Sequence, residues 1–409
     1  MTRAGLTLIT TVFFETIVFA TISGALVYGG DATVQFRVHT IEEKIPGGYS
    51  VVVADINHDG KPDVIGVGLR GDEVAWYENP SWQRHVLVKG VSAALWAAAY
   101  DLHGEGVPTI ALITEFGMVY ARSKGLIWIL EHQGDPTELW KASQIDSTPT
   151  AHRLAWADID GDGKAELINA PLVGEGDATP PKYEGKATPL YYYRPPTSDG
   201  GEWKRFTIYD QLSGITHHVR AVKWVNGKRD QLLTAGFDGI MLHSASGSGD
   251  NLKWEHTVLS KGNEEPAPRA GANDVRILNM KGKRMLASIE PWHGNEVVVY
   301  SQGKNGEWQR KVLFDGLIEG HEICVGDFVG DGRDAIVIAD RAGNKTTNPH
   351  LFFPMDDNGT EWKHEIIDPN GMSGSGCAVA DINGDGRPDF VMIGSSTANI
   401  KWYENLGRQ

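Results

Sequence analysis

The chain is built from short apolar segments separated by tight polar turns, and few stretches show the spacing of an amphipathic helix. Two apolar runs flank an acidic, glycine-containing turn in three closely similar segments, residues 51–68, 154–170 and 378–394. Residues 97–113, 221–236, 275–290 and 323–339 keep the same frame but lose some or all of the acidic residues. The pattern therefore predicts a strand–turn–strand unit that occurs seven times.

The remainder of each repeat contains two more strand signals. A third apolar run occurs at residues 73–79, 189–195, 296–302 and 399–405. A fourth run begins with Trp and has Leu or Ile five residues later, as in Trp82 with Leu87 and Trp203 with Ile208. Four strands recurring at roughly 45 to 70 residues are typical of a propeller blade. We therefore expect an all-β fold, a seven-bladed β-propeller.

The two ends of the chain complement each other. The last repeat stops after its third strand, near Glu404, and the N-terminal segment has Phe36 and Ile41 at the spacing of a fourth strand. The N-terminal strand is therefore predicted to complete the last blade, which removes an open sheet edge. Residues 34–409 are then one propeller domain.

Composition adds limits on partners and location. The chain has 409 residues, 49 Gly, 13 Trp and a formal net charge of -15, so nucleic acid is not an expected partner. Residues 1–25 resemble a secretory signal, with Arg3 before an apolar run, and the sequons at Asn344 and Asn358 fit a secreted glycoprotein. We expect a secreted, extracellular monomer without a membrane span. The two cysteines, Cys324 and Cys377, are predicted to be buried free thiols.

The acidic turns have the composition of cation-binding loops. Oxygen side chains at alternate positions, followed by a further carboxylate, suit a hard ion such as Ca²⁺. A metal-free turn closed by Asx hydrogen bonds is the alternative for each loop. In either case the ligands are used within the loop, so any ion has a structural role. The predicted ligands are Asp55, Asn57, Asp59 and Asp63 in the first loop, Asp158, Asp160, Asp162 and Glu166 in the second, and Asp381, Asn383, Asp385 and Asp389 in the third.

A second group of polar residues lies at the opposite rim, where inner strands begin and second strands end. The candidates for proton transfer there are His218, His152, His293 and His321. The candidates for binding a substrate are Arg220, Arg269, Arg153, Tyr49, Trp96, Trp292, Asn273 and Tyr183, the last in a long insertion of the third repeat. Aromatic side chains with charged groups suit carbohydrate, and Arg suits a carboxylate. Together they indicate an anionic sugar, such as a uronic acid, that undergoes β-elimination with general acid–base help.

The repeats resemble the FG-GAP or VCBS family of β-propeller repeats. The rim segments around His152 and His293 are similar to those of the aldos-2-ulose dehydratase propeller and of fungal polysaccharide lyases acting on L-rhamnose-α-1,4-D-glucuronate ends. This resemblance implies a carbon–oxygen lyase that cleaves a glycosidic bond to glucuronate in an acidic plant-type polysaccharide, releases rhamnose, and holds Ca²⁺ at the channel centre. The alternatives are a non-catalytic glycan-binding propeller and a sugar dehydratase of the aldos-2-ulose type.

Overall fold

The computed structural model describes residue 1 and residues 27–28, 34–176, 183, 185–198, 201–341 and 347–408. The segment taken for a secretory signal and the sequon at Asn344 lie outside these residues, whereas Asn358 is exposed. No helix within the described ranges is long and apolar enough to cross a membrane.

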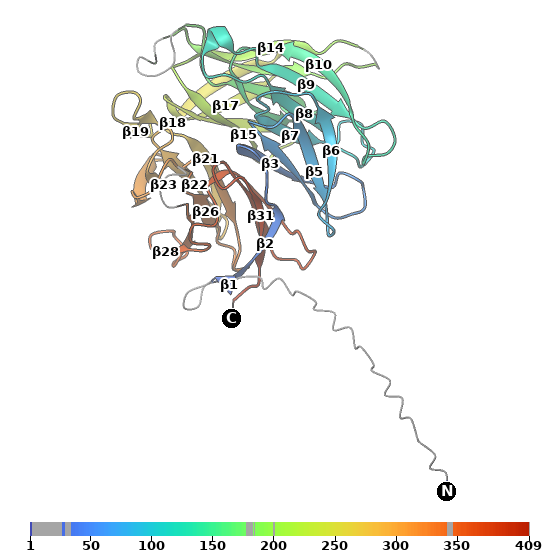
Figure 1. Cartoon of the computed structure of the whole chain (residues 1–409). Coiled ribbons are helices and arrows are strands. Elements are labelled where there is room, and N and C mark those ends of the chain that lie inside the picture. The colour runs from blue at the N-terminus through green and yellow to red at the C-terminus, as the bar shows by residue number, and fades with distance from the viewer. Residues whose placement is uncertain are drawn as a thin grey trace.

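Within the described residues, six four-stranded antiparallel sheets and one five-stranded antiparallel sheet follow one another along the chain, which confirms the predicted seven-bladed propeller (Figure 1). The first two blades are β3(Gly48–Ala54), β4(Asp63–Gly68), β5(Glu73–Glu78), β6(Gln83–Lys89) and β7(Trp96–Tyr100), β8(Thr109–Thr114), β9(Leu126–Glu131), β10(Lys141–Ser147). The third and fourth are β11(Ala151–Ala157), β12(Glu166–Pro171), β13(Thr188–Arg194), β14(Lys204–Leu212) and β15(Thr216–Val222), β16(Gln231–Gly236), β17(Gly239–Ser246), β18(Lys253–Ser260). The fifth and sixth are β21(Asp274–Met280), β22(Lys283–Glu290), β23(Glu296–Gln302), β24(Trp308–Phe314) and β25(Ile323–Gly326), β26(Ala335–Ala339), β27(Pro349–Pro354), β28(Trp362–Ile366).

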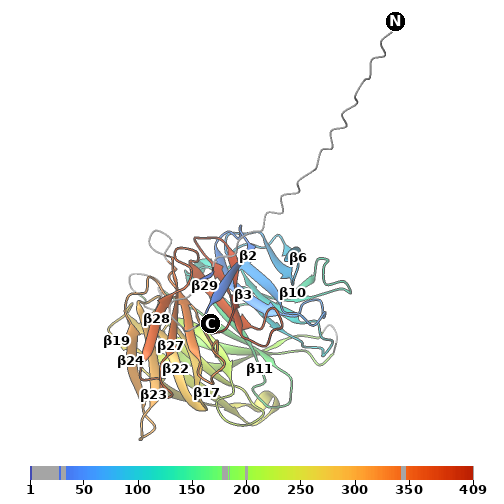
Figure 2. The ribbon, with the colours of Figure 1, turned by 90° about the horizontal axis from the view of Figure 1, so that it is seen from below.

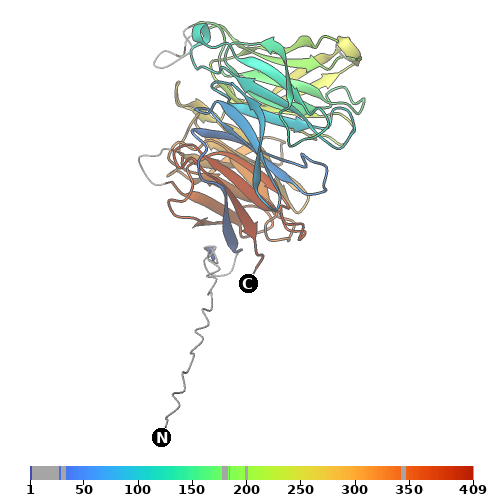
Figure 3. The same ribbon diagram turned by 45° about the vertical axis from the view of Figure 1, so that its right-hand side comes forward.

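The seventh blade joins the two ends of the chain. It contains β29(Gly374–Ala380), β30(Asp389–Gly394) and β31(Ile400–Asn405), and its outer strand is β2(Phe36–Glu42). Residues of β2 pair antiparallel with β31, from Phe36 opposite Asn405 to Glu42 opposite Ile400. Figures 2 and 3 show the N-terminal strand lying against the C-terminal sheet. The predicted closure is therefore confirmed, with a short β1(Val27–Tyr28) paired outside β2.

A few short elements lie outside the seven blades. A two-stranded sheet, β19(Asn263–Glu264) with β20(Ala270–Gly271), precedes the fifth blade. Two 3₁₀ turns, η1(Tyr120–Arg122) and η2(Gly249–Asn251), lie in loops. The inner strand of each blade contacts the inner strand of the next, and β29 contacts β3, so the inner strands form a closed ring. Residues at the starts of these strands are therefore brought to one mouth of the ring.

The core lies between neighbouring blades and is formed by continuous apolar middle strands. All six residues of β4, β8, β12, β16 and β30 are buried, because these strands are covered on both faces. At the closing blade, Phe36 of β2 contacts the rings of Phe328 and Phe390, with centroids 5.6 and 5.1 Å away. The N-terminal strand is thus anchored by an aromatic cluster as well as by its ladder.

The two cysteines correct one prediction from the sequence. Cys324 and Cys377 were expected to be free thiols, but they form a disulfide with a Cα–Cα distance of 5.8 Å. Cys324 lies on β25 and Cys377 on β29, the inner strands of consecutive blades. Each sequence position is apolar and buried, as expected, but the ring of blades places the two strands side by side. The bond therefore fastens the sixth blade to the closing blade.

Candidate active site

The mouth of the channel is shaped by β-bulges at the starts of inner strands. The register shifts between Gly48 and Ser50 in β3, between Ala151 and Arg153 in β11, and between Thr216 and His218 in β15. A bulge leaves one residue unpaired and changes the direction of its side chain. The three residues at these shifts are Tyr49, His152 and His217, all of which meet at the mouth.

Three imidazoles at this mouth are held in one tautomer by the neighbouring blade. The Nδ1 atoms of His152 and His217 lie 3.2 and 3.1 Å from the backbone oxygens of His217 and Asn273, and Nδ1 of His321 bonds the oxygen of Ser375. A carbonyl oxygen only accepts, so each Nδ1 carries the hydrogen and each Nε2 keeps its lone pair. The backbone thus presents three Nε2 acceptors toward a common centre.

These Nε2 atoms face Tyr49 and His293. The Tyr49 hydroxyl lies 2.9 Å from Nε2 of His152 and 3.1 Å from Nε2 of His321. Nε2 of His293 lies 3.3 Å from Nε2 of His217. One phenol hydrogen can serve only one of its two imidazole neighbours. The centre therefore has more acceptors than its own hydroxyl can satisfy.

Two guanidiniums border the imidazoles without a carboxylate partner. Arg153 is fully buried, lies 4.3 Å over the ring of Trp96, and donates from Nε to Nε2 of His218 at 3.3 Å. Arg341 lies 3.3 Å from Nε2 of His293. Among the residues that the structure describes, no carboxylate lies within ion-pair distance of either guanidinium. The mouth therefore carries positive charge that is not neutralised locally.

The same environment keeps the imidazoles uncharged. Burial first, and then the Arg153 guanidinium, holds the pKa of His152 well below its usual value. Burial and the charge of Arg341 lower the pKa of His293 and of His321 in the same way. Neutral imidazoles at neutral pH are competent as bases and as metal ligands.

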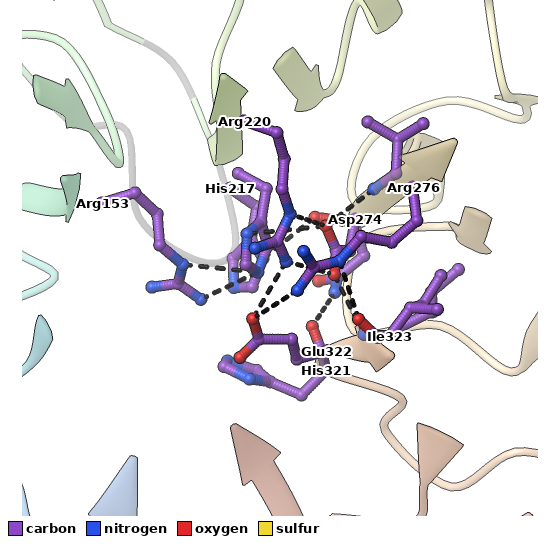
Figure 4. A network of polar contacts seen from close by, with 12 residues as sticks. Arg153, His217, Arg220, Asp274, Arg276, His321, Glu322 and Ile323 are labelled. Carbon is purple, nitrogen blue, oxygen red and sulfur yellow. Dashed lines mark hydrogen bonds and ion pairs between the residues drawn. The ribbon is translucent and has the colours of Figure 1, made fainter. Parts of the chain in front are cut away.

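A second network lies directly beside the imidazoles, and in it Arg220 and Arg276 are paired with carboxylates (Figure 4). Arg220 donates to both oxygens of Asp274, at 3.1 and 2.7 Å, and to Glu322 at 3.0 Å. Arg276 reaches Glu322 at 3.2 Å. His218 is fully buried, with Nδ1 3.5 Å from Asp274. This network fixes the inner strands of the fourth, fifth and sixth blades to one another.

His293 of the imidazole group also lines a cavity of about 310 Å³, together with Tyr183, Arg269 and Trp292; we call this hollow the central cavity. Tyr183 comes from the long insertion of the third blade, and its ring centroid lies 5.8 Å from that of Trp292. Arg269 bonds Glu265 at 2.7 Å. The central cavity thus joins the imidazole cluster to an aromatic wall.

The candidates chosen from the sequence fall into three places. His152, His293, His321 and Tyr49 form the imidazole cluster, with Trp96 and Arg153 beside it. Arg269, Trp292 and Tyr183 line the central cavity, and Asn273 supports the cluster by donating to the oxygen of His321 at 2.6 Å and accepting from the amide of His293 at 3.0 Å. His218 and Arg220 belong to the paired network instead. Their assignment to chemistry stays a prediction.

His217 and Arg341 are not among the candidates named from the sequence, and both belong to the centre. The choice between His217 and His218 depends on the bulge of β15, which the apolar spacing does not reveal. Arg341 lies two residues after the end of β26, outside the apolar pattern, so the sequence does not show which way its side chain points. The aromatic and charged composition of the rim was the available signal.

The acidic turns at the opposite rim have the closed form of Asx loops. Asp55 accepts from the amides of Asp59 and Gly60, and Asp381 accepts from those of Gly384 and Gly386. The last carboxylate of each intact loop, Asp63, Glu166 or Asp389, is buried. Calcium in these loops stays a prediction, and in the second loop Arg194 lies 2.8 Å from Asp160 and 3.3 Å from Glu166.

Comparison with known proteins supports the resemblance found in the sequence. Residues 124–303 match the family model of the aldos-2-ulose dehydratase β-propeller domain. Residues 327–392 match the model of an FG-GAP-like repeat. The chain is 23% identical over 397 residues to aldos-2-ulose dehydratase of Phanerodontia chrysosporium, a match that covers 85% of this chain.

That match covers 41% of the dehydratase, so the chain spans about two-fifths of the length of this curated relative. Among solved structures, a chain of the mitotic checkpoint complex aligns over 96% of this chain with a TM-score of 0.54 and 13% identity. This likeness supports the propeller fold alone. The resemblance to the glucuronate lyases stays a prediction.

Proposed function

We propose that this protein is a secreted carbon–oxygen lyase that cleaves a glycosidic bond to a uronic acid by β-elimination. The observation that carries the proposal is that two guanidiniums, Arg153 and Arg341, lie beside a cluster of neutral imidazoles. Neither guanidinium has a carboxylate partner in the described ranges. A uronate supplies the missing carboxylate. The leader-like N-terminus and the disulfide, which persists in oxidising compartments, support secretion.

The reaction needs three functions from the protein. One group removes the proton on the carbon next to the carboxylate, a second protonates the oxygen that leaves from the adjacent carbon, and a third stabilises the charge that develops on the carboxylate. The electron pair of the C–H bond becomes the new C=C bond, and the C–O bond breaks. The products are an unsaturated uronate and a saccharide with a free hydroxyl.

We assign proton transfer to the hydrogen-bonded pair of Tyr49 and His152. The neutral Nε2 of His152 can accept a proton, and the Tyr49 hydroxyl 2.9 Å away can donate or relay one. Arg153 and Arg341 bind and stabilise the substrate carboxylate, since a guanidinium matches a carboxylate in charge and geometry. General acid–base groups typically contribute about 10²- to 10⁴-fold each, so this charge stabilisation is needed as well.

The remaining imidazoles fit a metal ion. His217, His293 and His321 each offer a nitrogen within 4.8 Å of the others. Three nitrogen donors suit an ion such as Zn²⁺ better than Ca²⁺, which takes oxygen ligands. The three nitrogens would hold the ion, which as a Lewis acid would polarise a bound carboxylate. The donor set therefore favours a nitrogen-preferring metal over the central Ca²⁺ expected from the resemblance.

A sugar dehydratase is the second candidate, because residues 124–303 match the propeller of that enzyme class. Dehydration also breaks one C–H and one C–O bond, so the same proton-transfer groups would serve. A small keto-sugar substrate has no carboxylate, which leaves Arg153 and Arg341 without a partner. The two unneutralised guanidiniums favour the uronate.

The test is product analysis on a panel of uronate-containing gums and pectin-like polymers, with small keto-sugars in parallel. We expect an ultraviolet-absorbing unsaturated uronate that mass spectrometry identifies. Arg341→Met should lower kcat/KM by roughly 10²- to 10³-fold, the loss typical of removing one electrostatic stabiliser. The matched control is Arg122→Ala, an exposed rim arginine outside the site, which should retain activity. Glycan binding without any unsaturated product would instead identify a lectin.

A further inference from the structure

A second hollow lies on the same rim, between the second and third blades. This outer groove has a volume of about 340 Å³, which is in the range of ligand-binding pockets. Its lining includes Tyr120 of η1, Ser147 at the end of β10, Pro149, Lys186 and Tyr191 of β13. Most of these residues belong to connections that lead into an inner strand or follow a second strand, as the residues of the candidate active site do. The outer groove thus opens on the mouth side of the ring.

The charges in the outer groove are balanced, unlike those at the mouth. Lys186 contacts Glu175 at 2.5 Å, and Arg205 contacts Asp146 at 2.8 Å. An additional carboxylate would therefore meet cations that already have partners. Each ion pair still offers both a donor and an acceptor to a ligand with hydroxyl groups. This balance favours a neutral, polyhydroxylated ligand.

The aromatic residues support the same ligand class. Tyr120 and Tyr191 are partly exposed, and the guanidinium of Arg205 lies 5.0 Å from the ring centroid of Tyr191. Within the described part of the chain, neither hydroxyl has a hydrogen-bond partner. Prolines at positions 149, 171 and 189 add apolar wall. Flat apolar surfaces next to free hydroxyls match the C–H face and the hydroxyl edge of a sugar ring.

The outer groove and the central cavity share one wall. Val173 lines the outer groove, and it packs in a cluster with Tyr183 and Trp292, which line the central cavity. Thr150, two residues before His152, donates its hydroxyl to the oxygen of Val173 at 2.8 Å. Val173 therefore connects the lining of the outer groove to the lining of the central cavity.

We propose that the outer groove is a subsite for a neutral sugar of the same saccharide chain whose uronate binds at the mouth. The inference rests on the proposed function for the statement that the saccharide contains a uronate. It rests on the lining of the outer groove for the statement that the second sugar is neutral. It implies an oligosaccharide or polymer as substrate, since a single small sugar would leave the outer groove empty.

The test uses a neutral galacto-oligosaccharide of four units for binding. For turnover it uses saccharides of two and of four or more units in which a glucuronate carries a rhamnose on the oxygen that leaves in the elimination. Calorimetry should detect binding of the neutral tetrasaccharide to the wild-type chain. Tyr120→Ala should weaken that binding about tenfold, the effect of losing one apolar contact face. Val119→Ala is the matched control, because Val119 lies next to Tyr120, is 39% exposed and does not line the outer groove. Circular dichroism checks that both variants are folded.

Turnover separates this inference from the proposed function. Tyr120→Ala should lower kcat/KM about tenfold on the longer rhamnosyl-glucuronate saccharide and leave the rhamnosyl-glucuronate disaccharide unaffected. If the neutral tetrasaccharide does not bind, or binds Tyr120→Ala equally well, the subsite is refuted even though uronates are cleaved. If no uronate is cleaved but Tyr120→Ala weakens tetrasaccharide binding, the subsite stands and the lyase assignment fails.

Discussion

The disulfide between Cys324 and Cys377 gives the most quantitative prediction about stability. The perturbation is the double substitution Cys324→Ala/Cys377→Ala. The two cysteines are separated by 53 residues in sequence and are 2% and 4% exposed. In the chain-entropy model, a cross-link that closes a loop of this length restricts the unfolded chain by about 4 kcal/mol. The double variant should therefore lose about 4 kcal/mol of the free energy of unfolding.

The assay is equilibrium unfolding in guanidinium chloride, followed by tryptophan fluorescence. The midpoint should fall, and the slope with denaturant should rise, because the unfolded chain without the cross-link exposes more surface. The wild-type chain measured with a thiol reductant provides the matched comparison. Reductant should destabilise the wild type and leave the double variant unaffected.

Two results would refute this reasoning. The first is a loss below about 1 kcal/mol in the double variant, which would mean that the unfolded chain is not restricted by the bond. The second is equal sensitivity of both proteins to reductant, which would mean that the bond is not formed in solution.

Two further predictions concern the closing strand and a buried histidine. Phe36→Ala should cost about 3 to 5 kcal/mol of unfolding free energy in the same assay, because Phe36 is fully buried between Phe328 and Phe390; a loss below about 1 kcal/mol would show that β2 does not secure the ring. Burial lowers the pKa of His243 to about 3, so protons bind the unfolded state more strongly, and stability should fall as pH drops below about 6.5. His243→Gln should reduce that fall by up to about 1.4 kcal/mol per pH unit between pH 6 and pH 4, and identical pH slopes in both proteins would contradict the assignment.

Much of the fold could be predicted because the same local signals occur seven times. Apolar runs around acidic or glycine turns predicted the inner hairpins. The spacing of Phe36 and Ile41 predicted that the N-terminal segment supplies the fourth strand of the last blade. The disulfide was missed because each cysteine was judged on its own strand. Cys324 and Cys377 occupy similar places in consecutive repeats, shortly before Asp327 and Asp381. Once the repeats are arranged in a ring, those places become neighbours.

The site was predictable as a region and not as a set of roles. Counting blades placed His152, His293 and His321 on one rim, and the structure brings them together. The spacing could not separate His217 from His218, because a bulge of one residue decides which side chain enters the centre. It also could not show that Arg220 is paired with Asp274, whereas Arg153 has no carboxylate partner among the described residues.

The closure of the ring also bears on the chemistry of the site. The tautomer of His321 depends on the backbone oxygen of Ser375, which lies on β29 of the closing blade. That blade is completed by β2 and fastened to β25 by the disulfide two residues beyond Ser375. Loosening either connection would free the carbonyl that holds the hydrogen on Nδ1 of His321, and with it the lone pair that Nε2 directs to the centre. The elements that complete the propeller are therefore also the elements that keep this imidazole ready to bind.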